Sequence, residues 1–208
     1  MTTTFLLIRH GQTEWNRVER FRGHADVPLN DTGLKQAEAT GRYVAAQWQP
    51  AAIYSSPLSR AVKTAETIGR HAGLQVEIYP DLTDIDYGEW QGVTPEEAIR
   101  RWPEMVEAWY DAPQRVRIPG GETLEALRKR AMETIKNLTQ LHSGQTIVLV
   151  GHTVINKIIL LGVLGLGSEC LWHIEQDACA INVFKAAAGD YTLSSLNNTC
   201  HLSNLASM

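Results

Sequence analysis

The stretch that decides the fold is FLLIRHGQT, residues 5–13. Its first four residues, Phe5 to Ile8, are all apolar, which predicts a short strand buried on both faces, as in a parallel sheet. The run ends at Arg9, His10 and Gly11, where charged side chains and a glycine predict a loop. Ligands of open α/β sheets bind beyond the carboxyl ends of the strands, so these residues are candidates for a site.

Two further segments repeat this pattern. Ala51 to Ser55 ends at Ser56-Pro57, and Thr146 to Val150 ends at Gly151-His152. Strands that alternate with helices predict an α/β fold in three layers, with a mostly parallel central sheet covered by helices on both faces. The helices are predicted from apolar residues that recur on one helical face, in residues 31–47, 58–71, 123–141 and 154–164.

The rest of the chain is expected to complete one domain. No linker or repeat divides it, so residues 1–208 are predicted to form a single domain. The irregular stretch of about residues 81–120 is interpreted as an inserted helical lid. Short helices are expected within this stretch at 95–101 and 104–109. Outside it, an edge strand is expected at 76–78 and a closing hairpin at 178–186 and 191–196.

The composition is that of an average globular protein. The 208 residues are 44% apolar and 20% charged, and the formal net charge is −4. This balance supplies no basic field, so neither nucleic acid nor a membrane is expected as a partner. The apolar run of residues 147–166 is long enough to span a membrane. His152, Asn156 and Lys157 in its middle instead favour a buried strand and helix.

Cysteine usage and the first residues predict the compartment. The three cysteines have no CxxC spacing, which is typical of a reducing environment. The N-terminal segment lacks a basic region, and its apolar run is too short for a signal peptide. A cytoplasmic protein is therefore expected.

Two histidines and two arginines are predicted to meet at one edge of the sheet. His10 and His152 each follow a strand, and Arg9 directly precedes His10. Arg60 lies at the start of the helix that follows Ser56-Pro57. Arginine is suited to bidentate binding of a tetrahedral oxyanion, and a helix N-terminus adds backbone N–H donors. The sequence therefore predicts a phosphate pocket.

At this point the sequence resembles the histidine phosphatase superfamily, the phosphoglycerate mutase-like enzymes. The resemblance covers nearly the whole chain, and six matches in the right order make it specific. They are LIRHGQTEWN (residues 7–16), residues 28–33, SPLSRA (56–61) with Thr64-Ala65, YGEWQG (87–92), PGGET (119–123) and VGH (150–152).

The resemblance implies a covalent mechanism. His10 attacks phosphorus and becomes a phosphohistidine, Arg9, Arg60 and His152 hold the phosphoryl oxygens, and Asn16 adds a hydrogen bond. Phosphoryl transfer needs mainly positioning and charge neutralisation, which these side chains supply, so no metal and no cofactor are expected. His10 must be neutral to attack, and its second ring nitrogen is expected to donate to a backbone carbonyl.

An acidic residue is needed to protonate the leaving alcohol. Family members carry a glutamate in a segment that resembles residues 82–92 of this chain, and Asp84 stands at its position. Asp86, two residues further on, is the alternative. Thr153 follows His152 where the family has glycine or another small residue, and it is included among the substrate-binding residues.

Substrate preference is expected to come from the mouth of the pocket. Arg22 and Gly23 lie in the loop after the nucleophile, where the leaving group should pass. Arg115 and Arg117, in the lid, are alternatives to Arg22. An arginine there predicts a preference for small phosphate esters that carry a carboxylate.

The resemblance is strongest to broad-specificity and α-ribazole-type phosphatases, and bacterial phosphoserine phosphatases look much the same. Phosphoglycerate mutases carry an arginine where this chain has Ile85, so hydrolysis of a small phosphate ester is predicted. A cofactor-dependent mutase and a catalytically silent phosphate-binding protein are the alternatives. A monomer and a homodimer are both compatible with the sequence.

Overall fold

A six-stranded sheet forms the centre of the computed structural model, which describes residues 1–205. Its strands are β1 (Thr3–Arg9), β2 (Ala52–Ser55), β3 (Val76–Ile78), β4 (Thr146–Gly151), β5 (Ile181–Ala187) and β6 (Asp190–Asn198). Their order is β3-β2-β4-β1-β5-β6. The first four in this order run parallel, and the hairpin β5–β6 is added antiparallel beside β1. The predicted mostly parallel sheet is confirmed.

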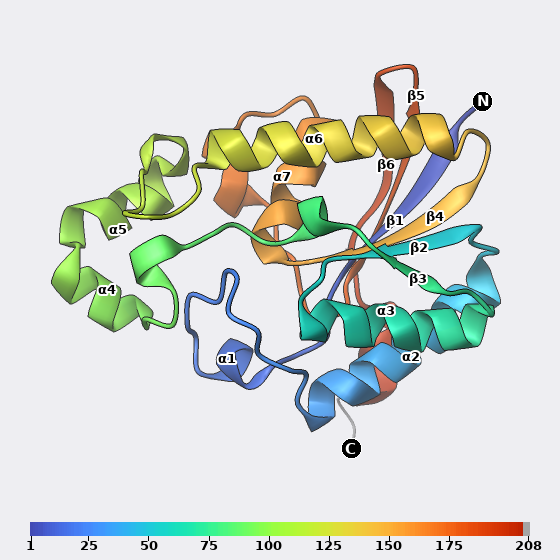
Figure 1. Ribbon diagram of the computed structural model, residues 1–208, viewed down its shortest axis with the longest axis horizontal. Helices are drawn as coiled ribbons and strands as arrows, with labels where there is room; N and C mark the ends of the chain where they lie inside the picture. The colour runs from blue at the N-terminus through green and yellow to red at the C-terminus, as the bar shows by residue number, and fades with distance from the viewer. Residues whose placement is uncertain (206–208) are drawn as a thin grey trace.

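Helices cover both faces of the sheet (Figure 1). α2 (Asp31–Gln47) and α3 (Ser59–Ala72) lie on one face, and α6 (Leu124–Leu141) and α7 (Thr153–Val163) lie on the other. The three-layer arrangement is as predicted, and each of these helices begins and ends within one residue of its predicted range. Within residues 1–205, no helix is both long and apolar enough to cross a membrane.

Alternate residues of β1 pack on opposite faces of the sheet. Phe5 and Leu7 belong to the core cluster beneath α6 and α7, whereas Leu6 and Ile8 belong to the cluster beneath α2 and α3. None of the four has solvent exposure. A strand covered on both sides has no polar face, which explains why residues 5–8 are uniformly apolar.

The segment between β3 and α6 leaves the sheet and packs around tryptophans. Trp90 and Trp109 are buried with ring centroids 6.0 Å apart, and Trp172 lies 5.7 Å from Trp109. The two expected short helices are present, at the left of Figure 1. The elements of this segment are η1 (Pro80–Leu82), η2 (Gly88–Trp90), α4 (Pro95–Arg101), α5 (Pro103–Asp111) and η3 (Pro113–Arg115).

Some details differ from the sequence-based expectation. β5 starts at Ile181, not at residue 178, because Cys179 has a φ of +58°, which interrupts extended backbone. Outside the segment between β3 and α6, three short helices have no clear sequence pattern, because so few residues give no periodic signal. They are α1 (Glu14–Arg17), η4 (Ser168–His173) and η5 (Cys200–Leu205).

The loop after β1 lies in direct backbone contact with the start of α2. A Cβ atom added to Gly33 would lie 2.1 Å from the Gln12 carbonyl oxygen, and one added to Gly11 would lie 2.6 Å from the Gly33 carbonyl oxygen. The Asn30 amide also donates to the Gln12 carbonyl at 3.0 Å. Glycine is required at both positions because no side chain fits between the two backbones.

Gly33→Ala is therefore expected to lower the free energy of unfolding by about 1–3 kcal/mol, since either α2 or residues 10–12 must shift. Chemical denaturation measures this effect. Thr32→Ala is the matched control, because Thr32 is exposed in the same helical turn. Equal stability of the two variants would contradict the proposed backbone constraint.

Candidate active site

The parallel register between β1 and β4 brings the two histidines together. Arg9 pairs with Gly151, and the His10 amide donates to the Gly151 carbonyl at 3.1 Å, which extends the ladder by one residue. The ring centroids of His10 and His152 are 5.0 Å apart, and both side chains are buried. The convergence predicted from the two strand ends is confirmed.

The His10 ring is held as one tautomer. Its Nδ1 lies 2.7 Å from the Gly11 carbonyl oxygen, as expected from the sequence. A carbonyl only accepts, so Nδ1 carries the hydrogen and Nε2 carries the lone pair. Burial, together with the neighbouring His152, Arg60 and Arg9, lowers the pKa of His10 well below its ordinary value of 6.5. At neutral pH, Nε2 is therefore unprotonated and carries a free lone pair.

The His152 ring is fixed on both sides. Its Nδ1 accepts from Arg60 Nε at 3.2 Å, and its Nε2 lies 2.7 Å from Ser56 Oγ. Because Nδ1 accepts, Nε2 carries the hydrogen and donates to the serine. Burial, and then the Arg60 charge, lowers the pKa of His152 well below 6.5. His152 is thus neutral and holds the Arg60 side chain in place.

Arg60 is fully buried at the first turn of α3. Its Nη1 donates to the Ala25 carbonyl at 2.6 Å, and its Nη2 donates to the Gly23 carbonyl at 2.9 Å. Burial lowers the pKa of Arg60 to about 10, so the guanidinium remains charged at neutral pH. Arg60 therefore connects His152 to the loop that contains Gly23, whose carbonyl binds Arg60.

Arg9 supplies a second cation, which is half-buried. Its Nη1 donates to the Gln176 carbonyl, and its Nε has no hydrogen-bond partner within the described residues. Burial, and then the Arg22 charge, lowers the pKa of Arg9 to about 10. Gln176 is itself anchored by Asn182, which accepts from Gln176 Nε2 at 2.9 Å. No sequence motif marks either residue, and this support for Arg9 was not predicted.

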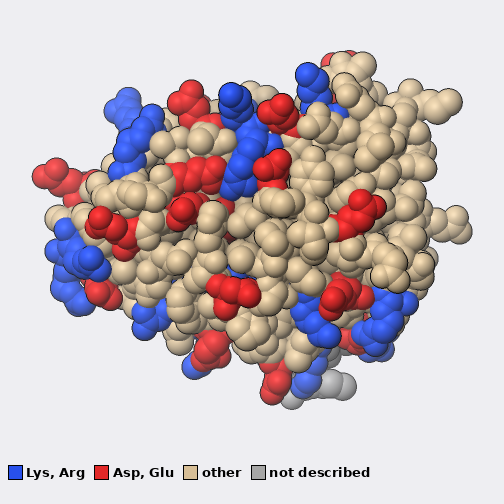
Figure 2. Space-filling model, in the orientation of Figure 1, with Lys and Arg blue, Asp and Glu red and all other residues tan. Residues whose placement is uncertain are grey.

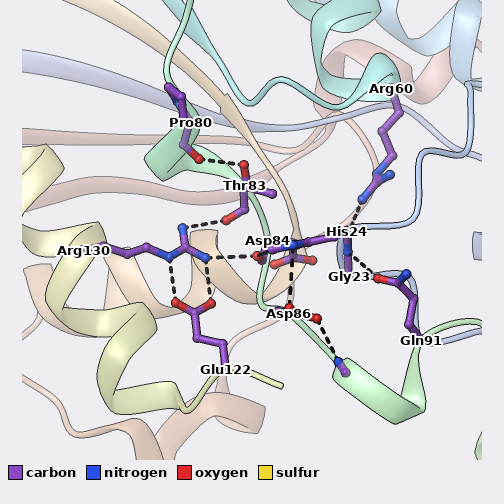
Figure 3. Close-up of polar contacts among 11 residues, drawn as sticks. Gly23, His24, Arg60, Pro80, Thr83, Asp84, Asp86, Gln91, Glu122 and Arg130 are labelled. Atoms are coloured by element: carbon purple, nitrogen blue, oxygen red, sulfur yellow. Dashed lines mark hydrogen bonds and ion pairs between the residues drawn. The ribbon is translucent and has the colours of Figure 1, made fainter. Parts of the chain in front are cut away.

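The structure brings Asp84, and not Asp86, into the pocket. Asp84 is buried, and its Oδ1 accepts from the Val154 and Ile155 amides, each at 3.1 Å, at the N-terminus of α7. Asp86 Oδ1 accepts from the Gly88 amide at 2.8 Å (Figure 3), and its side chain is 40% exposed. Of the two candidates, Asp84 is the one beside Arg9 and Thr153.

Two more predicted residues, Asn16 and Thr153, line the pocket with polar side chains. Asn16 Oδ1 accepts from the Thr13 amide at 2.9 Å and from the Thr13 hydroxyl at 2.8 Å. This leaves the Asn16 amide group free to donate. Thr153 lines the same pocket, and its buried hydroxyl has no partner within the described residues.

These side chains surround a cavity of about 380 Å³. Of the predicted residues, Arg9, Asn16, Arg22, Asp84 and Thr153 line it. His10, Arg60 and His152 are buried and are not among the lining residues, and neither is Gly23. Arg115 and Arg117 are not in its lining. Eight further residues line the cavity and were not predicted from the sequence. Tyr87 belongs to the matched segment YGEWQG, whereas the other seven lie in none of the matched segments. The eight are Glu19, Arg20, Phe21, Tyr87, Pro95, Tyr110, Val154 and Trp172.

The face of the molecule in Figure 2 shows no broad basic surface of which the arginines of the site could be a part. There, Lys and Arg side chains alternate with Asp and Glu side chains. Among residues 1–205, no three or more His, Cys, Asp or Glu side chains are grouped so that they could hold a metal ion.

Comparison with known families identifies the chain. The model of the histidine phosphatase superfamily (branch 1) matches residues 5–199. The chain belongs to this superfamily. Two similar curated enzymes are Phosphoserine phosphatase 1 of Hydrogenobacter thermophilus and the Metal-independent phosphoserine phosphatase of Arabidopsis thaliana. The first is 32% identical and aligns over 95% of this chain and 93% of its own length. The second is 30% identical, with coverages of 98% and 84%.

Solved structures agree with this assignment. The phosphoserine phosphatase of Entamoeba histolytica, in complex with 3-phosphoglyceric acid, has a TM-score of 0.86 at 28% identity and covers 96% of this chain and 99% of its own. α-Ribazole phosphatases are also among the similar structures. This histidine phosphatase is accordingly a phosphoric monoester hydrolase.

Both active-site histidines of the histidine phosphatase are expected to remain neutral at pH 6.5, because burial and the nearby cations lower their pKa values. The unfolded chain protonates them near pH 6.5 and the folded chain does not. The free energy of unfolding should therefore fall as the pH decreases from 6.5 towards the folded-state pKa values.

NMR titration of the imidazole signals measures the two pKa values directly, with His10→Gln and His152→Gln used to assign the signals. A titration midpoint at or above 6.5 for either ring would contradict the neutral pair.

Proposed function

We propose that this histidine phosphatase hydrolyses small phosphate monoesters through a phosphohistidine on His10. The observation that carries the proposal is the 2.7 Å hydrogen bond between His10 Nδ1 and the Gly11 carbonyl. It keeps the lone pair on Nε2, the nitrogen that must attack phosphorus. The lowered pKa of His10 supports the same role, because it keeps this nitrogen unprotonated.

In the first step, His10 Nε2 bonds to phosphorus and the ester P–O bond breaks. Asp84 gives its proton to the leaving alkoxide, and the alcohol departs. Arg9 and Arg60 neutralise the phosphoryl oxygens, and the free amide group of Asn16 donates to one of them. His152 holds Arg60 and can redirect its Nε2 hydrogen from Ser56 to the substrate.

In the second step, water replaces His10 on phosphorus. Asp84, now ionised, takes a proton from the attacking water, the P–N bond breaks, and inorganic phosphate leaves. Thr153 supplies a further donor through its unpaired hydroxyl. Two guanidinium groups and several neutral donors carry out the charge neutralisation, so the proposed reaction uses no metal and no cofactor.

Hydrolysis is favoured over transfer to a second substrate by Ile85. This residue is fully buried and presents no charge to the pocket, where mutases of the superfamily have an arginine. Without that cation, retention of a doubly phosphorylated intermediate is weaker. Release of the phosphoryl group to water is the expected outcome.

His10→Ala should lower turnover by more than about 10⁴-fold, since the nucleophile is lost. It should also remove the acid-labile label that wild-type enzyme takes from ³²P-labelled substrate. EDTA should leave wild-type activity unchanged. Undiminished turnover in His10→Ala, or loss of wild-type activity in EDTA that added metal restores, would refute the mechanism.

We propose that Arg22 gives a preference for esters that carry a carboxylate. Arg22 lines the cavity, and its Nη1 is steadied by the Trp15 carbonyl at 3.1 Å. Arg20, in the same lining, adds a second cation. The named substrate of both phosphoserine phosphatase relatives carries a carboxylate, as does the 3-phosphoglyceric acid bound by the Entamoeba histolytica enzyme.

Arg22→Ala should lower kcat/KM about tenfold more for phosphoserine than for phenyl phosphate, because a charge-assisted hydrogen bond is lost. Steady-state kinetics on both substrates measures the difference. Arg115→Ala is the control, because Arg115 is exposed and lies outside the cavity lining. Equal losses on the two substrates in Arg22→Ala would contradict this assignment.

We further propose that the predicted single domain comprises the described residues 1–205, with about residues 81–120 as a lid over the cavity. Residues 206–208 of the predicted range lie outside the described residues. Pro95 of α4 and Tyr110 of α5 support this proposal, because both contribute to the cavity mouth. Substrates that extend beyond the phosphate would contact these two residues.

A further inference from the structure

Arg130 lies on α6, outside the cavity lining, and all three nitrogens of its guanidinium donate hydrogen bonds. Its Nη1 donates to the Asp81 carbonyl at 2.7 Å and to the Thr83 carbonyl at 2.8 Å. Its Nη2 donates to the Asp84 carbonyl at 3.0 Å. One guanidinium therefore binds three carbonyl oxygens of the loop that carries the proposed proton donor. Figure 3 shows the contacts with Thr83 and Asp84.

The remaining donors of Arg130 bind Glu122. Nε donates to Glu122 Oε1 and Nη2 donates to Glu122 Oε2, each at 2.8 Å. The two side chains are only 21% and 18% exposed, so water competes less for this pair than for the exposed ion pairs of the surface. Bidentate arginine–carboxylate pairs have a defined geometry, and the orientation of the guanidinium is therefore fixed.

Glu122 is itself attached to the far side of the same loop. Its amide donates to the Asp86 carbonyl at 2.8 Å. The Gly88 backbone lies so close to residues 119–121 that an added Cβ would be 2.2 Å from the Pro119 carbonyl oxygen. The segment around Glu122 and the loop of Asp84 are thus joined by backbone contacts as well as by the ion pair.

Asp84 is held from two directions. On one side, the α7 amides of Val154 and Ile155 bind its Oδ1. On the other side, its carbonyl accepts from Arg130 and from His24 Nε2, the latter at 3.0 Å. The α7 amides fix one carboxylate oxygen, but the direction of the second oxygen depends on where the backbone lies. Arg130 and His24 together hold the backbone at Asp84, and Arg130 alone also binds the carbonyls of Asp81 and Thr83.

We propose that Arg130 and Glu122 form a clamp that positions Asp84 for proton transfer to the leaving group. The clamp is defined by these two side chains, and the inference rests on the proposed function, in which Asp84 is the general acid. Arg130 touches no reacting atom and acts through Asp84. A misplacement of about 1 Å at a catalytic group can lower the rate about a hundredfold. Loss of the clamp should therefore have a measurable effect on kcat/KM.

The test compares two substrates that differ in their need for an acid. The leaving group of β-glycerophosphate is a basic alkoxide that requires a proton. The leaving group of p-nitrophenyl phosphate is a stabilised phenolate that hardly requires one. The ratio of the two kcat/KM values is independent of the fraction of active protein. Partial misfolding of a variant therefore cannot imitate the expected effect.

Asp84→Asn should lower this ratio by about 10²-fold or more, as loss of a general acid does. Arg130→Ala should lower it about tenfold or more, and Arg130→Lys and Glu122→Gln should each lower it by less. In the Asp84→Asn background, Arg130→Ala should change the ratio less than about twofold, because the two residues act as one unit.

Arg70→Ala is the matched control. Arg70 forms an ion pair with Glu38 at 2.7 Å on α3 and α2, and its loss should leave the ratio unchanged. A wild-type ratio in Arg130→Ala alongside a reduced ratio in Asp84→Asn would overturn the clamp while leaving the proposed function intact. An equal reduction by Arg130→Ala with and without Asp84 would also overturn it. A wild-type ratio in Asp84→Asn would instead refute Asp84 as the acid.

Discussion

The hydrogen bond from the His10 amide to the Gly151 carbonyl is the contact on which the site depends. It continues the β1–β4 ladder past the last paired residues, Arg9 and Gly151. The residues that follow these two strands, His10 and His152, are therefore held at the carboxyl ends of the strands, with their imidazole rings 5.0 Å apart. A second contact, from the Ser56 amide to the Val150 carbonyl at 3.1 Å, adds the end of β2 to the same edge.

Burial of charge is the second constraint. Arg60 lies in the interior and Arg9 is half-buried, and removing an unpaired ion from water is costly. Backbone carbonyls of Gln176, Ala25 and Gly23 offset part of this cost. The remaining positive potential disfavours protonation of the neighbouring histidines. The same two cations that neutralise a phosphoryl group thus keep its proposed nucleophile neutral.

Several glycines of the matched segments lie where two backbone segments pack too closely for a side chain. Gly33 allows the nucleophile loop to pack on α2, and Gly88 allows the Asp84 loop to pack on residues 119–121. These contacts fix the His10 loop and the Asp84 loop relative to the helices around them. Segments of the family pattern that contain no reacting residue therefore have a structural explanation.

The sequence by itself determined the three layers and the succession of strands and helices along the chain. It also predicted that His10, Arg9, Arg60 and His152 would lie close together. These features follow from local periodicity and from the rule that parallel strands end at one edge. Tertiary structure decided which of Asp84 and Asp86 lies in the pocket, because only the Asp84 carboxylate reaches the amides of α7. It also decided the supports of the site, Gln176 behind Arg9 and Arg130 behind Asp84. Such contacts join residues far apart in the chain and leave no periodic pattern, since a hydrogen bond to a backbone carbonyl constrains only one of the two side chains.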